Sequence, residues 1–417
     1  MSALTVRPSG PLEGSVAVGG AKNSVLKLLA ATLLAPGSYV LRNVPAIADV
    51  EWMSDLLRSM GCRVDRPEPH VVEVERPPSI EPVAPYELVE RMRASIVVLG
   101  PLLAREGRAR VSLPGGDDFG SRPIDMHLRG LEQLGATFTT SHGYIEAEAA
   151  GLKGTRIMLE YPSVGATENA LMAAVLADGT TVIDNAAREP ELWDLASFLN
   201  RMGARVLGAG TSTITVEGVT RDDLSAVEHT VVPDRVEAAT YLAAVAVAGG
   251  EVTVEGARVD HMEMFVQKLG EMGVRISPDP AGLWAMAPAR LRSIDVATLP
   301  YPGVATDYKP LFVVMLSVAD GVGIVTENIF AGRFRYIDEL VRMGADIRTD
   351  GHHAVVRGRD RLSGAPVRAP DIRAGAALVL AGLKADGETV VHDIEHVDRG
   401  YEDLVGQLRT LGADVTR

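Results

Sequence analysis

Residues 376–387, AALVLAGLKADG, and residues 411–415, LGADV, decide the fold because both segments recur along the chain. The shorter segment follows the pattern Met/Leu-Gly-small-x-apolar, and its glycine returns at intervals of 68 to 74 residues. In each copy a second glycine lies 23 to 28 residues earlier and closes an apolar stretch. The chain is therefore expected to contain six copies of one unit. The glycines of the pattern are Gly61, Gly135, Gly203, Gly273, Gly344 and Gly412, and the earlier glycines are Gly37, Gly107, Gly179, Gly250, Gly321 and Gly387.

Each copy is expected to fold as a buried helix, a strand, an amphipathic helix and a further strand. The apolar stretch predicts a helix that ends at a glycine, and β-branched runs such as TTVID, residues 180–184, predict the following strand. Helices that are apolar on all sides lie inside, so strands and amphipathic helices should surround them. The fold class is therefore α/β. Chance recurrence of helix-glycine-strand turns is the alternative, and the near-constant spacing argues against it.

The length of the chain favours two domains. A single hydrophobic core stops growing at about 250 to 300 residues, and this chain has 417 residues. Six units alone are compatible with one closed ring or with two groups of three, and the size favours two groups. The period also exceeds the roughly 20 to 50 residues of common stacked repeats, so a solenoid is not expected.

Composition and charge exclude several classes of protein. The formal net charge is −14 and there is no basic run to neutralise a row of phosphates, so nucleic acid is not an expected partner. Charge-free apolar stretches such as residues 238–250 are shorter than the roughly 18 residues of a membrane span. The segment MSALTVRPSG lacks the features of a secretory signal, and Cys62 is the single cysteine, so we expect a cytoplasmic protein. The nine histidines have no metal-ligand spacing, and no metal is predicted.

Two groups of charged residues occupy matching places in different copies of the unit. Residues of the first group lie where an apolar stretch begins. Residues of the second group follow the next strand and lie 12 or 15 residues after the glycine that closes the apolar stretch. Guanidinium groups bind phosphate and carboxylate through paired hydrogen bonds, and helix N-termini add N–H donors. The set predicts a cationic cleft for a small polyanion. The alternative is that these residues are surface ion-pair partners of the 55 acidic residues. The first group is Lys22, Arg93, Asp307 and Arg373, and the second group is Arg122, Arg333 and Arg399.

The loop LPGGDDFGSRP, residues 113–123, combines three glycines with adjacent carboxylates at Asp117 and Asp118. This composition predicts a mobile lid that carries an acid. Adjacent carboxylates disfavour each other's ionisation and closure would desolvate them, so either could donate a proton near neutral pH. The alternative is an ordinary solvated turn.

These motifs together resemble the enolpyruvyl transferase superfamily, and the resemblance covers essentially the whole chain. It implies a two-domain inside-out α/β barrel of six βαβαββ-type units, three per domain. The N-terminal domain would span residues 21–231 and carry the lid, and the C-terminal domain would combine residues 1–20 with residues 232–417. The active site would lie in the interdomain cleft. The motifs are GGAKNS (19–24), MRASI (92–96), LPGG (113–116), GSRPIDMH (120–127), PSVGATEN (162–169), DNAAREPE (184–191), PDRVEA (233–238), TD (306–307), TENIFAGRF (326–334), DIRAGA (371–376) and DRGYE (398–402).

The resemblance also implies a reaction. The enolpyruvyl group of phosphoenolpyruvate would pass to the 3-hydroxyl of UDP-N-acetylglucosamine, with release of phosphate through a tetrahedral ketal, as the first committed step of peptidoglycan synthesis. Asp307 would remove the hydroxyl proton and Asp117 would be the candidate acid, while Lys22 and Arg399 would stabilise the moving charge. No cofactor is implied, the two substrates are the expected partners, and the chain is expected to be a monomer.

By position, the resemblance assigns residues to two ligand sites. The phosphoenolpyruvate site would take Lys22, Asn23, Arg122, Arg333, Arg373 and Arg399. The UDP-N-acetylglucosamine site would take Asn23, Arg93, Arg122, Pro123, Ile124, Asp125, Met126, Ser163, Val164, Gly165, Asp307 and Ile329.

The sequence departs from the family pattern at the lid, where most members carry a cysteine in place of Asp117. The family has an aspartate subclass, so the implied activity stands. The epoxide fosfomycin alkylates a thiolate, and a carboxylate is a far weaker nucleophile toward it, so resistance to fosfomycin is expected. Tyr161 and Val97 also stand where other members carry lysine or tryptophan, and both changes fall near the implied acceptor.

Two alternative functions are also compatible with these residues. One is an enolpyruvyl transferase with another acceptor, either a different nucleotide in specialised metabolism or shikimate 3-phosphate. The motifs RPIDMH and GGDDFG resemble the nucleotide-sugar branch and argue against the shikimate acceptor. The other alternative is a binding protein without catalysis, against which the presence of both a candidate acid and a candidate base argues.

Overall fold

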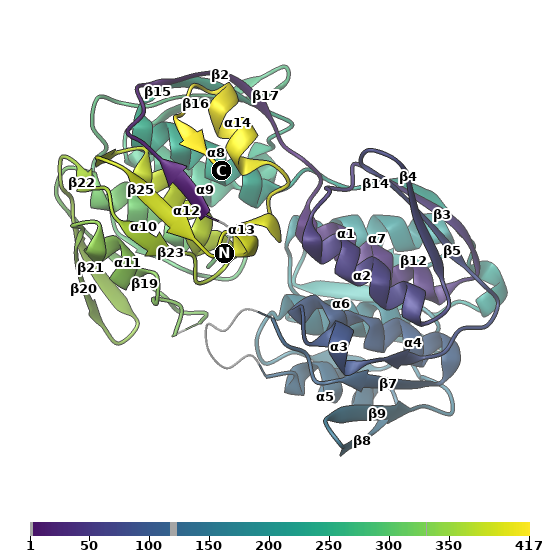
Figure 1. Ribbon diagram of the computed structural model, residues 1–417. Coiled ribbons are helices and arrows are strands. Elements are labelled where there is room, and N and C mark those ends of the chain that lie inside the picture. Colours follow the sequence, from purple (N-terminus) through teal and green to yellow (C-terminus); the bar gives the residue numbers. More distant parts are fainter. Residues whose placement is uncertain (1–2, 117–122, 331) are drawn as a thin grey trace. The chain divides into compact units, whose positions relative to one another are not determined.

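The computed structural model describes residues 3–116, 123–330 and 332–417, which form two compact units. The N-terminal unit comprises residues 20–116 and 123–232, and the C-terminal unit comprises residues 3–19, 233–330 and 332–417 (Figure 1). Each unit has its own hydrophobic core. The chain crosses from one unit to the other after Gly19 and again after Val232, one residue from the boundaries expected at 21 and 231.

Six four-stranded sheets, three in each unit, make up most of the described strands, and all follow one pattern. A parallel pair of strands is extended by two antiparallel strands, as in the sheet of β6, β7, β9 and β8. The expected six repeated units, three per domain, are therefore confirmed. In the N-terminal unit the sheets run, in spatial order, β14 (Glu228–Thr230), β3 (Gly37–Arg42), β5 (Val71–Arg76) and β4 (Arg63–Glu68); β6 (Val83–Ala84), β7 (Arg108–Ser112), β9 (Tyr144–Glu148) and β8 (Thr137–Ser141); and β10 (Arg156–Met158), β11 (Thr180–Asp184), β13 (Thr213–Glu217) and β12 (Arg205–Leu207).

The sheets of the C-terminal unit include the first strands of the chain. They run β2 (Leu12–Ala17), β15 (Gly250–Glu255), β17 (Gly282–Met286) and β16 (Arg275–Asp279); β18 (Val296–Ala297), β19 (Val322–Thr326), β21 (His353–Arg357) and β20 (Asp346–Asp350); and β23 (Pro366–Arg368), β25 (Thr389–His392), β1 (Ala3–Val6) and β26 (Val415–Thr416). A short additional pair joins β22 (Leu362–Ser363) to β24 (Ala385–Asp386). The purple strands β1 and β2 in Figure 1 thus lie among elements from the second half of the chain, as the resemblance implied.

The helices separate into buried and amphipathic ones, because the apolar stretches have no polar face to expose. The buried helices α8 (Arg235–Ala248), α10 (Lys309–Ser317) and α12 (Ile372–Gly382) pack against one another in the C-terminal unit. The N-terminal unit buries α1 (Lys22–Ala31), α4 (Leu99–Glu106) and α6 (Val164–Ala174), with the 3₁₀ segments η1 (Thr32–Leu34) and η2 (Arg93–Val98) beside them. The remaining helices are α2 (Ala48–Ser59), α3 (Tyr86–Val89), α5 (Asp125–Gln133), α7 (Pro190–Met202), α9 (Glu263–Glu271), α11 (Ile337–Arg342), α13 (Glu395–Asp398) and α14 (Leu404–Thr410), with η3 (Arg221–Asp223) and η4 (Val259–His261).

The recurring glycines have a backbone reason. All six glycines of the pentapeptide pattern have φ between 82° and 116°, and all six earlier glycines have φ between 72° and 135°. L-residues with a Cβ rarely adopt this region, whereas glycine enters it freely. The two glycines per unit therefore mark the two places where a helix ends and the chain reverses into a strand.

Within the described residues, no helix is both long enough and apolar enough to cross a membrane.

Candidate active site

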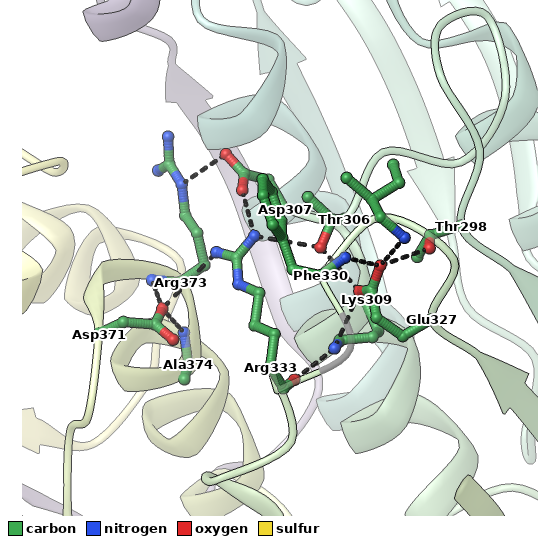
Figure 2. A network of polar contacts seen from close by, with 11 residues as sticks. Thr298, Thr306, Asp307, Lys309, Glu327, Phe330, Arg333, Asp371, Arg373 and Ala374 are labelled. Carbon is green, nitrogen blue, oxygen red and sulfur yellow. Dashed lines mark hydrogen bonds and ion pairs between the residues drawn. The ribbon is translucent and has the colours of Figure 1, made fainter. Parts of the chain in front are cut away.

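Three of the residues predicted from the sequence meet in the C-terminal unit. Asp307 lies two residues before α10, and its Oδ1 accepts a hydrogen bond of 2.7 Å from Nη1 of Arg333 (Figure 2). The Nε atom of Arg373, in the first turn of α12, lies 3.6 Å from Oδ2 of the same carboxylate. Both arginine side chains are 4% exposed, whereas that of Asp307 is 26% exposed. For these two arginines the alternative of surface ion-pair partners is wrong.

This arrangement keeps Asp307 ionised. Burial alone would raise the pKa of Asp307, but Arg333, and after it Arg373, outweigh that effect and hold this pKa well below its ordinary value. The same carboxylate raises the pKa of Arg333 despite burial. A small anion that entered beside Asp307 would meet two desolvated guanidinium groups, which bind phosphate and carboxylate strongly.

The start of α12 fixes the position of Arg373. Asp371 is the N-cap of this helix, and its Oδ1 accepts hydrogen bonds from the backbone N–H groups of Arg373 at 2.8 Å and Ala374 at 2.9 Å. The guanidinium carbon of Arg373 lies 5.2 Å from the centroid of the Tyr401 ring.

Arg399 directly follows α13. A Cβ atom built on Gly400 would lie 3.4 Å from Nη1 of Arg373, so the backbone immediately after Arg399 passes against that guanidinium group. Arg333 and Arg373 thus meet at Asp307, and the convergence of Arg399 with them stays a prediction.

Beside Asp307, a buried acid organises the loop that carries Ile329. Glu327 follows β19 and accepts hydrogen bonds from the backbone N–H groups of Ile329 at 2.7 Å and Phe330 at 3.0 Å. It also pairs with Lys309, the first residue of α10, at 2.9 Å. The sequence prediction named Ile329 but neither Glu327 nor Lys309.

In the N-terminal unit, Lys22 opens the buried helix α1. Its side chain is 9% exposed, and its Nζ lies 2.7 Å from Oδ2 of Asp49, which belongs to the first turn of α2. Asn23 follows in α1, and Lys27 donates a 2.9 Å hydrogen bond to the backbone oxygen of Asn23. Asp49 was not predicted, although a carboxylate is the group that a buried lysine needs.

Most of the described residues expected at the sugar nucleotide come from three segments of the N-terminal unit, apart from Asn23 in α1 and Asp307 and Ile329 in the C-terminal unit. Arg93 begins η2, residues 123–126 lead into α5, and Ser163 caps α6 by accepting a hydrogen bond from the N–H of Ala166. A Cβ atom built on Gly165 would lie 2.7 Å from Cε1 of His127, so the first turns of α5 and α6 touch. Helix N-termini and arginine side chains are groups that bind anions in proteins.

His127 and Asn169 hold these segments together; both belong to motifs quoted from the sequence, but neither was assigned a role. Asn169 is fully buried, and its Nδ2 lies 2.8 Å from Nδ1 of His127 and 3.1 Å from the backbone oxygen of Ile96. Its Oδ1 accepts a 2.8 Å hydrogen bond from the N–H of Gly100. Burial, and after it Arg93, lowers the pKa of His127 to about 4, so this ring is neutral at physiological pH.

The lid is described only at its ends. Gly115 and Gly116 pack against the chain around Glu90 and Arg93, because a Cβ atom on Gly115 would lie 1.9 Å from the Glu90 oxygen and one on Gly116 would lie 2.8 Å from the Arg93 nitrogen. The predicted acid Asp117, its neighbour Asp118 and the predicted ligand Arg122 lie outside the described residues.

The chain is similar to known proteins over nearly its whole length. The family model described as EPSP synthase (3-phosphoshikimate 1-carboxyvinyltransferase) matches residues 6–408. A protein of Corynebacterium jeikeium named UDP-N-acetylglucosamine 1-carboxyvinyltransferase is 53% identical over 406 residues, which cover 97% of this chain and 96% of that protein. A protein of Nocardia farcinica with the same name is 54% identical over 411 residues, again covering 97% and 96%.

Solved structures agree with this similarity. The enolpyruvyl transferase NikO from Streptomyces tendae matches with a TM-score of 0.89 at 26% identity and covers 99% of this chain and 98% of its own. An EPSP synthase from Acinetobacter baumannii matches with a TM-score of 0.76 at 17% identity, with full coverage of both chains, and supports the fold alone. The chain therefore belongs to the enolpyruvyl transferase family, in the group of the UDP-N-acetylglucosamine 1-carboxyvinyltransferases.

Proposed function

We propose that this chain transfers the enolpyruvyl group of phosphoenolpyruvate to the 3-hydroxyl of UDP-N-acetylglucosamine and releases phosphate, as the first committed step of peptidoglycan synthesis. The observation that carries the chemistry is the ionised Asp307 held between the buried guanidinium groups of Arg333 and Arg373. The choice of acceptor rests on two relatives, 53% and 54% identical to this chain, that are named UDP-N-acetylglucosamine 1-carboxyvinyltransferase.

The donor is proposed to bind at the arginines of the C-terminal unit. The phosphate and carboxylate of phosphoenolpyruvate match the forked donors of Arg333, Arg373 and Arg399. Lys22, Asn23 and Arg122 of the N-terminal unit are proposed to complete the site. The lysine suits a place where charge moves during the reaction, because it is a compact point charge on a flexible stem.

Anion binding would also activate Asp307. The carboxylate is a poor base while the two arginines keep its pKa low. When phosphoenolpyruvate takes over hydrogen bonds of Arg333 and Arg373, the carboxylate loses part of its stabilisation and its pKa rises toward the working pH. Asp307 then accepts the proton of the sugar hydroxyl only when the donor is present.

The acceptor is proposed to lie on the N-terminal unit. Its diphosphate fits the N-termini of α5 and α6 beside Arg93, where N–H donors and a positive charge converge. Asn23, Arg122, residues 123–126 and residues 163–165 are the proposed contacts there. Because Asp307 and Ile329 belong to the other unit, we propose that residues of both units take part in the reaction.

The proposed transfer has two stages. In the addition, the 3-oxygen of the sugar bonds to C2 of phosphoenolpyruvate, Asp307 takes the hydroxyl proton, and an acid protonates C3 to give the tetrahedral ketal. In the elimination, the bond from C2 to the phosphate oxygen breaks, a proton leaves C3, and the double bond re-forms. Asp117 is the proposed acid, and Lys22 and Arg399 are proposed to stabilise the charge on the phosphate.

Phosphate release with four acceptors tests this function. We expect turnover of phosphoenolpyruvate with UDP-N-acetylglucosamine and none with UMP, UDP-glucose or shikimate 3-phosphate. We also expect the rate to be unchanged by fosfomycin, because Asp117 offers no thiolate to alkylate. Covalent labelling of Asp117 by fosfomycin under assay conditions would contradict that part. The expected setting is the cytoplasm and the expected active form is a monomer.

Replacing the proposed base separates catalysis from binding. Asp307→Asn keeps the size of the side chain and removes its basicity, so we expect kcat to fall by roughly 10²- to 10⁴-fold. Calorimetric binding of UDP-N-acetylglucosamine should persist. Wild-type kcat in this variant would exclude Asp307 as the base.

A second candidate keeps the chemistry and changes the acceptor. It is favoured by the similarity to NikO, a solved enolpyruvyl transferase at 26% identity. The same panel decides between the two, since preference for UMP or UDP-glucose would identify a transferase with another nucleotide acceptor.

A further inference from the structure

The carboxylate of Glu327 is saturated with hydrogen bonds. Its side chain is completely buried. Oε1 accepts from the Thr298 hydroxyl at 2.7 Å as well as from the backbone of Ile329 and Phe330, while Oε2 accepts from the Thr306 hydroxyl at 2.7 Å and pairs with Lys309 (Figure 2). A carboxylate has about four lone-pair sites, so no capacity is left for a substrate.

Lys309 is as deeply buried as its partner. Its side chain has no exposed surface. Its Nζ donates to the backbone oxygen of Arg333 and lies 4.0 Å from the centroid of the Phe334 ring. A buried ion pair is weak evidence for stability, because desolvation offsets much of the attraction and a well-packed apolar pair often does as well. The pair therefore calls for a role other than stability.

Both residues of the pair are connected to Arg333 by hydrogen bonds. Lys309 holds the backbone of that residue, and Glu327 reaches its guanidinium through Thr306. The Thr306 hydroxyl donates to Glu327 and accepts a 3.2 Å hydrogen bond from Nη1 of Arg333, the atom that also donates to Asp307. The orientation of Arg333 toward Asp307 is thus set from both its backbone and its side chain.

We propose that Lys309 and Glu327 are positioning residues for the transfer reaction: without touching either substrate, they fix the guanidinium group of Arg333 against the carboxylate of Asp307. This inference rests on the proposed function, since it assigns Arg333 to the donor and Asp307 to the base. Displacement of a reacting group by about 1 Å can lower a rate by roughly 100-fold. The network is therefore expected to act on kcat.

Two threonines provide a matched pair for the test. Thr298 and Thr306 each donate one 2.7 Å hydrogen bond to Glu327. Thr306 continues to Arg333, whereas Thr298 accepts from the backbone N–H of Asn328. Thr306→Val should lower kcat by about 10- to 100-fold, and Thr306→Ser, which keeps the hydroxyl, should restore most of it. Thr298→Val should act mainly on the KM for the acceptor, through the loop that carries Ile329. Lys309→Met should lower kcat as Thr306→Val does.

The outcomes separate positioning from a merely structural role. Equal loss of kcat in Thr298→Val and Thr306→Val, or no rescue by serine, would overturn the proposal. If Lys309→Met does not fold, the threonine variants still decide.

A second readout separates this proposal from the proposed function. If the unmutated protein shows no turnover with UDP-N-acetylglucosamine, the proposed function fails, and calorimetric binding of phosphoenolpyruvate replaces kcat. Its Kd should rise by about tenfold in Thr306→Val and stay near wild type in Thr306→Ser and Thr298→Val. Unchanged binding in Thr306→Val, or no binding by the unmutated protein, would overturn the inference.

Discussion

Glu168 shows what burial does to a single carboxyl group in this protein. It lies in α6 with no exposed surface, 3.4 Å from Nζ of Lys27. Burial raises the pKa of Glu168 to about 7, against the attraction of Lys27 and with repulsion from Glu191 and Glu189. The folded protein therefore keeps a proton on Glu168 in a pH range where the unfolded chain has released it.

The sign of the resulting pH dependence follows from linkage. The folded pKa lies above the unfolded value of 4.5, so this group stabilises the fold below about pH 4.5, and that contribution is lost as pH rises through about 7. The glutamine in Glu168→Gln cannot ionise. The free energy of unfolding of this variant, relative to that of wild type, should therefore increase by roughly 3 kcal/mol from pH 4 to pH 8. Urea denaturation at both pH values measures this gain. The exposed residue Glu132 supplies the control Glu132→Gln, and a gain of equal size at both pH values would contradict the assignment.

At the residue scale, sequence patterns identified the charged residues that meet around Asp307 better than the residues that support them. Asp307, Arg333 and Arg373 stand at repeat-equivalent places, and the structure brings them together. The sequence pattern around Lys309 and Glu327 is less distinctive. Lys309 is a lysine in an apolar stretch, and Glu327 is an acid that follows a predicted strand. Their pairing depends on how the start of α10 packs against the loop that follows β19, which no local pattern encodes.

At the element scale, the two glycines of each unit were visible in the sequence because their cause is local. A helix that reverses into a strand needs positive φ whatever surrounds it. The steric demand differs between copies, however. A Cβ atom on Gly203 would lie 2.1 Å from the backbone oxygen of Asp223, whereas one on Gly61 would meet nothing within 4 Å.

This contrast predicts unequal effects of one substitution. Gly61→Ala should destabilise the fold by roughly 1 to 2 kcal/mol, the conformational penalty of the left-handed region alone. Gly203→Ala has a similar φ but adds a backbone clash, so its penalty should exceed that of Gly61→Ala by about 1 to 3 kcal/mol. Chemical denaturation of the two variants measures the difference in their free energies of unfolding. Equal losses would show that the backbone around Asp223 moves to accommodate the Cβ atom at little energetic cost.

The side chain of Asn169 holds several helix starts together, so its replacement should disturb their alignment. Asn169 joins η2, α4 and α5 to α6, so Asn169→Leu removes the bonds that align the proposed acceptor segments. We expect a loss of stability of about 2 to 4 kcal/mol, since buried partners are left unsatisfied. The KM for UDP-N-acetylglucosamine should rise more than kcat falls.

Asn200→Leu is the matched control for Asn169→Leu. Asn200 makes two side-chain bonds to the backbone of Val206, at 2.9 and 2.7 Å, and lies in α7. Its loss should lower stability and leave the acceptor KM unchanged. A rise in KM of the same size in both variants would mean that stability, rather than alignment of the helix starts, controls acceptor binding.

At the scale of the whole molecule, the count of six units and their grouping in threes followed from the repeat and the length. The pairing of the strands that close the sheets did not. β14 comes from the end of the N-terminal unit and pairs with β3, and β1 and β2 join sheets formed by the last part of the chain. Such pairings join segments that are hundreds of residues apart, and hydrophobic alternation gives the face of a strand but not its neighbour.

The same topology makes the two units unequal when the chain is cut. Residues 20–232 are continuous and contain all strands of their three sheets, so this fragment should fold alone. Residues 233–417 lack β1 and β2, which leaves β15 and β25 with unpaired edges. This second fragment should aggregate or remain unfolded.

Joining residues 1–19 to residues 233–417 should repair the second fragment. The oxygen of Gly19 accepts a 2.9 Å hydrogen bond from the N–H of Asp234, and the N–H of Gly19 donates to Glu237. A short Gly-Ser linker can therefore bridge the junction without moving either end. Circular dichroism and cooperative urea unfolding of the three fragments test the prediction. Cooperative folding of residues 233–417 without β1 and β2 would mean that the buried helices α8, α10 and α12 suffice to hold the unit, and that the first nineteen residues only cover its sheets.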